Sequence, residues 1–280
     1  MSRIERRFAA LRTEGRAGLV TYLTGGDPDF DTSVRLFGGL AEAGADLIEI
    51  GMPFSDPMAD GPVIQEAGQR ALKQGMTLRR TLGLVRELRR TDEATPIVLM
   101  GYYNPIYRYR PESFAQDAVA AGVDGVIVVD LPPEEDAELT EPASAAGLDF
   151  VRLATPTSDD RRLPRIIEHA SGFIYYVAVA GITGTRSADA ANIAAAVARL
   201  RRFTPLPIAV GFGIRTPQQA AEVARAADAA VIGTALVQRL ALNLNPDDTA
   251  KPDLVDAVLA DVRTLAQGIR DARRKPVSIR

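Results

Sequence analysis

The 280-residue sequence has no cysteine and a single histidine, His169. Disulfides and thiolate metal sites are therefore excluded, and a zinc site built from several histidine ligands has too few of them. The only lysines are Lys73, Lys251 and Lys275, and all three fall in predicted helices or polar segments. Because a Schiff-base enzyme needs a lysine at a strand end, imine chemistry is disfavoured as well.

Charge and hydropathy exclude further classes. The formal net charge is -3, and the arginine pairs are scattered along predicted helices, which is typical of solvated helix faces and not of a nucleic-acid groove. No apolar run approaches the ~20 residues that a membrane span needs. The N-terminal segment places Ile4, Phe8 and Leu11 at helical spacing, which favours an amphipathic helix over a signal peptide. We therefore expect a cytoplasmic protein.

Short apolar runs alternate with amphipathic helical patterns along the whole chain. We predict strands over residues 18–23, 47–51, 97–100, 125–129, 150–153, 173–178, 208–210 and 230–232. Predicted helices include 31–43, 112–121, 134–146, 187–202, 216–226 and a last one over 254–272. Eight strand-then-helix units predict an α/β fold: a single (β/α)8 TIM barrel over residues 1–280, with an extra N-terminal helix. A doubly wound open sheet is the alternative, but no G-x-G-x-x-G motif follows the first strand.

Glycines gather in three successive loops after the predicted sixth, seventh and eighth strands. These loops are 181–184, 211–213 and 233–234. Glycine lets the backbone approach a ligand closely, and the N–H groups that open the following helices attract an anion. Each loop alone also fits an ordinary turn, but together they lie where such barrels usually bind phosphate. They predict a pocket for a phosphate monoester.

Two carboxylates are placed for acid-base chemistry. Glu49 shares one strand face with Leu47 and Gly51, and a buried, unpaired carboxylate has a raised pKa. Asp60 follows on a loop stiffened by prolines, so the two acids face one cavity with different solvation, which separates acid and base roles. The structural alternatives are a buried ion pair for Glu49 and a helix cap for Asp60.

Residues 47–65, LIEIGMPFSDPMADGPVIQ, resemble the signature of the tryptophan synthase alpha subunit family. Further matching segments are 102–107, 130–132, 153–157, 175–177, 181–184 and 210–214, so the resemblance covers the chain from Phe8 to about Leu265. It implies cleavage of indole-3-glycerol phosphate to indole and glyceraldehyde 3-phosphate. That reaction, which belongs to the last steps of tryptophan biosynthesis, would need no cofactor and no metal.

The resemblance also implies roles for individual residues. Glu49 would move protons at indole C3 and at the adjacent side-chain hydroxyl, Asp60 would hold the ring N–H, and Tyr175 would lie close to Glu49. The predicted phosphate-binding residues are Thr183, Gly184, Gly211, Phe212, Gly213, Gly233 and Thr234. The positions expected around the indole ring are Tyr22, Leu99, Met100, Ile127, Val129 and Ile232.

Members of this family work against a beta subunit that uses pyridoxal phosphate, which implies an alpha2beta2 heterotetramer. The resemblance assigns the contact to Pro53, Phe54, Asp56, Pro57, Asn104 and Pro105. A rigid loop that frames the pocket is the structural alternative. We expect Phe54, Met58 and Ile106 to be exposed apolar residues near the mouth of the site.

The chain departs from the family pattern at a few positions. Val179 stands where many members have arginine before a Gly-Val-Thr-Gly loop, so its effect on loop closure and on communication is open. Thr234 replaces a usual serine, and Tyr22 replaces a frequent phenylalanine. Three functions stay open: the alpha subunit of a bifunctional complex, a free-standing indole-3-glycerol phosphate lyase, and a catalytically idle partner that activates a pyridoxal-phosphate enzyme.

Overall fold

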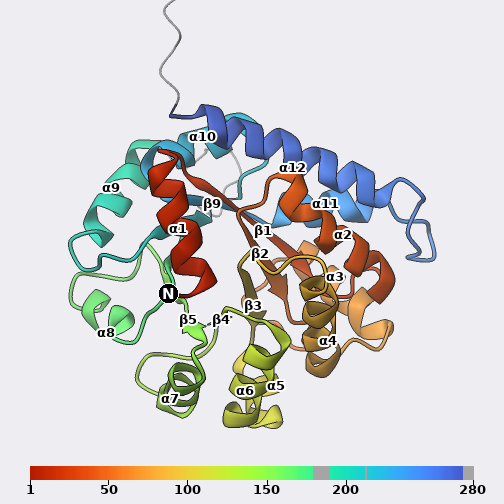
Figure 1. Cartoon of the computed structure of the whole chain (residues 1–280), viewed down its shortest axis with the longest axis horizontal. Helices are drawn as coiled ribbons and strands as arrows, with labels where there is room; N and C mark the ends of the chain where they lie inside the picture. Colours follow the sequence, from red (N-terminus) through yellow and green to blue (C-terminus); the bar gives the residue numbers. More distant parts are fainter. Residues whose placement is uncertain (179–189, 212, 274–280) are drawn as a thin grey trace, which may run out of the picture.

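The computed structural model describes residues 1–178, 190–211 and 213–273. Within them, nine strands form one parallel sheet in the order β5-β4-β3-β2-β1-β9-β8-β7-β6 (Figure 1). The strands are β1 (Gly18–Thr24), β2 (Leu47–Gly51), β3 (Ile97–Gly101), β4 (Gly125–Val128), β5 (Asp149–Phe150), β6 (Arg152–Ala154), β7 (Ile174–Val177), β8 (Ile208–Gly211) and β9 (Ala229–Ile232). The parallel order matches the predicted barrel and contradicts a doubly wound sheet, whose strand order would reverse.

The predicted fifth strand closes the barrel. It is divided at Val151: β5 pairs with β4, and β6 pairs with β7. The Val151 N–H donates to the Val126 carbonyl at 3.0 Å, so the contact with β4 continues through the break. One stretch of chain therefore joins both ends of the sheet, and the (β/α)8 TIM barrel is confirmed.

Helices surround the sheet (Figure 1). They are α1 (Arg3–Thr13), α2 (Phe30–Ala43), α3 (Pro62–Lys73), α4 (Leu78–Arg89), α5 (Tyr103–Tyr109), α6 (Pro111–Ala121), α7 (Ala137–Ala146), α8 (Leu163–Ile167), α9 (Ala190–Leu200), α10 (Pro217–Ala226), α11 (Thr234–Leu242) and α12 (Leu254–Asp271). Among the residues described, no helix is both long and apolar enough to cross a membrane.

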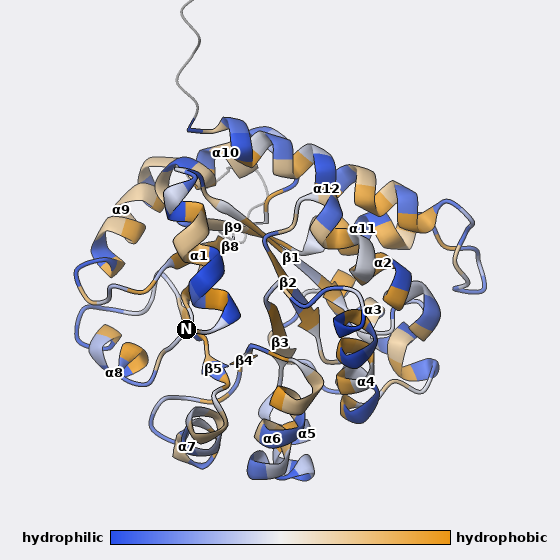
Figure 2. Cartoon of the chain, viewed as in Figure 1, coloured by the Kyte–Doolittle hydropathy of each residue, from blue (hydrophilic) through white to orange (hydrophobic). Residues whose placement is uncertain are grey.

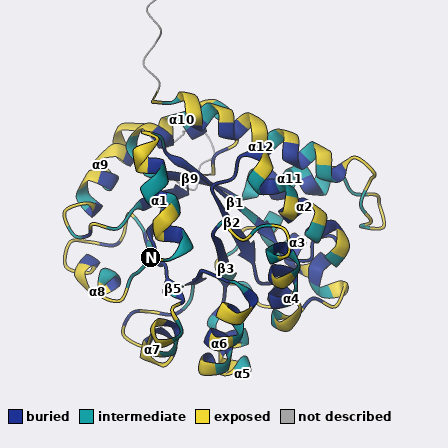
Figure 3. Cartoon of the chain, viewed as in Figure 1, coloured by how far each residue is buried: buried dark blue, intermediate teal, exposed yellow. Residues whose placement is uncertain are grey.

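Period-two alternation divides the apolar residues into two cores. The outer core lies between the strands and the helices, where the orange faces of Figure 2 coincide with the buried faces of Figure 3. The inner core fills the barrel with residues such as Leu47, Val98 and Ile127. Helix α1 contributes Ile4, Phe8 and Leu11 to this inner core, so the predicted amphipathic N-terminal helix closes the N-terminal end of the barrel.

Aspartates fix the starts of the strands at that same end. Each follows a helix and accepts a backbone N–H from the start of the neighbouring strand. The pairs are Asp46 with Leu19 at 2.8 Å, Asp124 with Ile97 at 2.8 Å and Asp228 with Ile208 at 2.9 Å. The Ala-Gly-x-Asp sequence recurs at 43–46 and 121–124. Its glycine ends the helix in the left-handed conformation, and its aspartate fixes the register of the neighbouring strand.

Candidate active site

Glu49 points into the barrel from β2, where its neighbours in register are Tyr22 on β1 and Val98 on β3. The side chain is 1% exposed, and neither carboxylate oxygen has a hydrogen-bond partner among the described residues. Burial raises the pKa of Glu49 to about 8, because the charged form loses its hydration without gaining a partner. Glu49 forms no ion pair with any described residue, so the structural alternative that the sequence left open for it does not occur there.

Asp60 lies on the loop between β2 and α3. Partial burial raises its pKa, while a hydrogen bond from the Tyr102 hydroxyl opposes this effect. The N-cap of α3 is Gly61, and no side chain caps that helix end, so Asp60 does not serve as the cap. Its carboxylate faces the same cavity as Glu49.

That cavity, of about 260 Å³, opens at the C-terminal end of the barrel. It is lined by Tyr22, Glu49, Ala59, Asp60, Gly61, Ile64, Met100, Tyr175, Val177, Ala178, Gly211, Gly213, Ile214, Val231, Gly233 and Thr234. None of these described lining residues is basic. In the same part of the chain, no group of three or more His, Cys, Asp or Glu residues is arranged to hold a metal ion.

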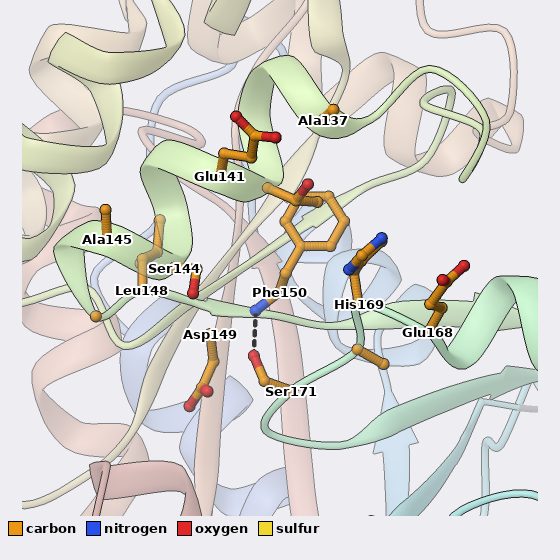
Figure 4. A pocket seen from close by; sticks show the side chains of 13 residues that line it. Ala137, Glu141, Ser144, Ala145, Leu148, Asp149, Phe150, Glu168, His169 and Ser171 are labelled. Carbon is orange, nitrogen blue, oxygen red and sulfur yellow. Dashed lines mark hydrogen bonds between the residues drawn. The ribbon is translucent and has the colours of Figure 1, made fainter.

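Figure 4 shows a larger groove, of about 730 Å³, on the outside of the barrel. It lies between α7 and residues 168–171, and Glu141 and His169 are among the residues that line it. Neither Glu49 nor Asp60 is among the residues that line this groove. The chemistry of Glu49 and Asp60 therefore assigns the candidate site to the smaller cavity.

Two tyrosines rest on glycines at the mouth of the cavity. A Cβ atom on Gly211 would come 2.5 Å from the Tyr175 hydroxyl, and one on Gly51 would come 2.3 Å from the Tyr22 hydroxyl. Both positions therefore require glycine. Burial, and next the charge of Glu49, raises the pKa of Tyr175 well above its ordinary value, so its hydroxyl stays a hydrogen-bond donor.

The described parts of the glycine loops meet on one side of the cavity, where Gly211, Gly213, Gly233 and Thr234 all line it. Thr234 begins α11, whose N-terminus has no side-chain cap. Gly213 has a φ of +60°, and a Cβ added there would meet nothing within 4 Å. This open space suits close approach of an anion to the backbone. The remaining predicted phosphate residues, Thr183, Gly184 and Phe212, and also Val179, lie outside the described residues.

The residues predicted around an aromatic ring divide into three groups. Tyr22 and Met100 line the cavity. Ile127 and Val129 face the barrel interior but do not line the cavity. Leu99 and Ile232 belong to the outer core, and the prediction that they surround the ligand is wrong. Side chains alternate along a strand, so the inward positions are those of their neighbours, Met100 and Val231.

Sequence reasoning missed Tyr102 as a functional residue. Its hydroxyl accepts the Ala59 N–H at 3.0 Å and is hydrogen-bonded to the Asp60 carboxylate, while its ring packs on Phe54 with 5.3 Å between centroids. Burial raises the pKa of Tyr102 to about 12. The residue follows β3 and holds the loop after β2, a contact that only the folded barrel reveals.

The predicted partner contact lies on two adjoining segments. Pro53, Phe54 and Pro57 are half-buried and Asp56 is exposed in the loop after β2, whereas Asn104 is exposed and Pro105 half-buried on α5. Met58 is 79% and Tyr107 59% exposed. The prediction that Ile106 is exposed is wrong: this side chain is fully buried, because it faces the outer core from α5.

The fold and site define a (β/α)8 barrel with two unlike carboxylates in a cavity at its C-terminal end. The family model described as "Tryptophan synthase alpha chain" matches residues 8–269. The alpha subunit of tryptophan synthase from Legionella pneumophila str. Paris is 39% identical, with a TM-score of 0.88 over 96% of this chain and 98% of that one. Tryptophan synthase from M. tuberculosis, in an open form with BRD0059 bound, is 34% identical, with a TM-score of 0.84 over 96% and 99%. This chain belongs to the tryptophan synthase alpha chain family.

Proposed function

We propose that this chain cleaves indole-3-glycerol phosphate to indole and glyceraldehyde 3-phosphate, as the alpha subunit of a tryptophan synthase. The observation that carries the proposal is the unpartnered, buried Glu49 beside Asp60 in a cavity that glycine loops border. Membership of the alpha chain family supports the same assignment. The reaction makes the chain a carbon-carbon lyase of tryptophan biosynthesis.

The two carboxylates divide the chemistry between them. With a pKa of about 8, Glu49 carries a proton at neutral pH and donates it to C3 of the indole ring. The product of this step is an indolenine, whose C=N⁺ group is the electron sink. The Asp60 carboxylate accepts a hydrogen bond from the ring N–H and stabilises the positive charge. No lysine imine is needed, because the substrate provides its own sink.

Bond cleavage then returns the proton. Ionised Glu49 takes the proton from the hydroxyl on the side-chain carbon attached to C3, and the bond between C3 and that carbon breaks. The bonding electrons neutralise the C=N⁺ group, which restores the aromatic ring, and the oxygen becomes the aldehyde of glyceraldehyde 3-phosphate. The proton donated in the first step stays on indole C3, and Glu49 ends protonated again, ready for another turnover.

The phosphate would bind at the backbone of Gly211, Gly213 and Gly233 and at the start of α11. Backbone N–H groups at a helix N-terminus attract an anion without a basic side chain. On the outside, the loop after β2 and α5 would contact a pyridoxal-phosphate-dependent beta subunit in an alpha2beta2 heterotetramer. Exposed Met58 and Tyr107 support this assignment, because apolar surface at a functional edge favours an interface.

Indole release from indole-3-glycerol phosphate tests the proposal, measured for the purified chain with and without a tryptophan synthase beta subunit. We expect slow release by the chain alone and a large increase with the beta subunit. Efficient release without a partner would favour the free-standing lyase. No release under either condition would contradict the proposal, and activation of the beta subunit without release would favour the idle partner.

A further inference from the structure

Tyr22 reaches the cavity from β1, the strand next to that of Glu49. The two residues are partners in register, and both side chains point inward. The side chain of Tyr22 lies between two glycines. A Cβ atom on Gly51 would come 2.3 Å from the Tyr22 hydroxyl oxygen, and a Cβ atom on Gly233 would come 3.1 Å from the Tyr22 Cβ. The hydroxyl therefore lies level with Gly51, one inward position beyond Glu49 toward the Asp60 loop.

The titratable groups around this hydroxyl come from four elements. They are Glu49 on β2, Asp60 on the following loop, Tyr102 after β3 and Tyr175 on β7. Burial and next the negative charge of Asp60 raise the pKa of Tyr22; a hydrogen bond with the Thr24 side chain opposes them, and the charge of Glu49 adds to the rise. The hydroxyl consequently stays protonated and remains a donor. None of the described residues that line the cavity offers either carboxylate a positive charge.

We propose that Tyr22 is a positioning residue for Asp60: with ligand in the cavity, its hydroxyl donates a hydrogen bond to the Asp60 carboxylate. Asp60 is then held between two hydroxyls, that of Tyr22 from β1 and that of Tyr102 from the segment after β3. This role rests on the proposed function, in which Asp60 must be ionised while Glu49 is protonated. Hydrogen bonds to the charged form favour ionisation of Asp60, whereas Glu49 has no such partner among the described residues.

Tyr22→Phe removes the hydroxyl and keeps the ring. The matched control is Tyr176→Phe, which removes a hydroxyl from the outer face of β7, where the ring is 5% exposed in the outer core. Asp60 is followed by carboxyl ¹³C NMR as pH is varied, with Asp60→Asn to assign its signal. The protein is saturated with 3-(indol-3-yl)propyl phosphate, which lacks the hydroxyls needed for cleavage.

With this ligand bound, we expect the pKa of Asp60 to be about one unit higher in Tyr22→Phe than in wild type, the size expected for one hydrogen bond to a charged group. Tyr176→Phe should match wild type. In turnover, the acidic limb of the pH profile of kcat, which reports the enzyme with substrate bound, should move upward by the same amount, which a loss of packing alone would not cause. An unchanged Asp60 titration in ligand-saturated Tyr22→Phe would overturn this role and leave the proposed function intact. A wild-type protein that does not bind the ligand would overturn both.

Discussion

The two ends of the barrel use acidic residues in opposite ways. At the N-terminal end, Asp46 and Asp124 are buried, and each accepts a backbone N–H and contacts two arginines. At the C-terminal end, Glu49 is as deeply buried, and its carboxylate has no hydrogen-bond partner among the described residues, while the partly buried Asp60 carboxylate accepts a hydrogen bond from the Tyr102 hydroxyl. Pairing satisfies the buried carboxylates of the first end, whereas the absence of a partner at the second end leaves Glu49 as a group that exchanges protons near neutral pH.

The paired end also attaches the N-terminal helix. Asp46 contacts Arg7 of α1 and accepts two hydrogen bonds from Arg16, both at 2.9 Å. The Asp124 carboxylate accepts one hydrogen bond from Arg3 of α1 at 2.9 Å and one from Arg89 of α4 at 2.7 Å. Two of the paired arginines that sequence reasoning placed on solvated helix faces, Arg7 and Arg89, therefore contact buried aspartates instead.

Among substitutions that distinguish the two ends of the barrel, Glu49→Gln should have the largest effect on activity. Removing the proton donor and acceptor should lower kcat by about 10³-fold, within the range for a general acid-base group. Binding of an indolylalkyl phosphate should be nearly unchanged, because the amide has the same shape. Indole release and ligand titration measure the two quantities. Near-normal turnover would contradict the role of Glu49.

The same substitution should stabilise the protein at alkaline pH. Glu49 titrates at its ordinary value of 4.5 in the unfolded chain and at about 8 when folded, so the folded state binds the extra proton between these values. The stability that depends on this group is fully present below pH 4.5 and is lost as pH rises through 8. Glu49→Gln should therefore exceed wild type by up to about 5 kcal/mol at pH 9. Urea unfolding at pH 5 and pH 9 measures this, and a difference independent of pH would contradict it.

Asp46→Ala should do the reverse at the paired end. It leaves two arginines and the Leu19 N–H without their acceptor, so the free energy of unfolding should fall by about 3 kcal/mol, with kcat unchanged while the protein stays folded. Asp46→Asn, which keeps an oxygen for Leu19, should lose less. Chemical denaturation and indole release measure both variants. A folded Asp46→Ala protein without activity would show that the two ends are not independent.

Gly213→Val should have the smallest effect and one specific to the ligand. The new side chain extends into the open space where the phosphate is proposed to bind, so KM should rise about tenfold, equivalent to about 1.4 kcal/mol. Gly15→Val at the opposite end is the matched control, since Gly15 has a similar φ of +67° and equally open surroundings. The control should share the backbone strain and keep the wild-type KM. Equal KM values would place the phosphate elsewhere.

Periodicity predicted the strands well because each run of alternating or continuous apolar residues had to be buried in one of the two cores. Most boundaries fall within a residue or two; the predicted helix at 134–146 begins later, at Ala137, after a turn. Assigning inward and outward faces was harder. Leu99 and Met100 are both apolar, and only the register of β3 places the first against helices and the second in the cavity.

The sequence by itself determined the candidate barrel and its two acids: eight apolar segments, each followed by a helical pattern, predict a closed parallel sheet, and Glu49 within such a segment has to be buried. Only the tertiary structure decided which acids are paired. Arg3 and Arg7 of α1 and Arg89 of α4 come from two helices far apart in the chain and meet buried aspartates at one end. At the other end, Tyr102, which follows β3, is hydrogen-bonded to Asp60, and Tyr22 on β1 lies within reach of its charge. Such convergence depends on strand register and loop closure, which local propensity does not encode.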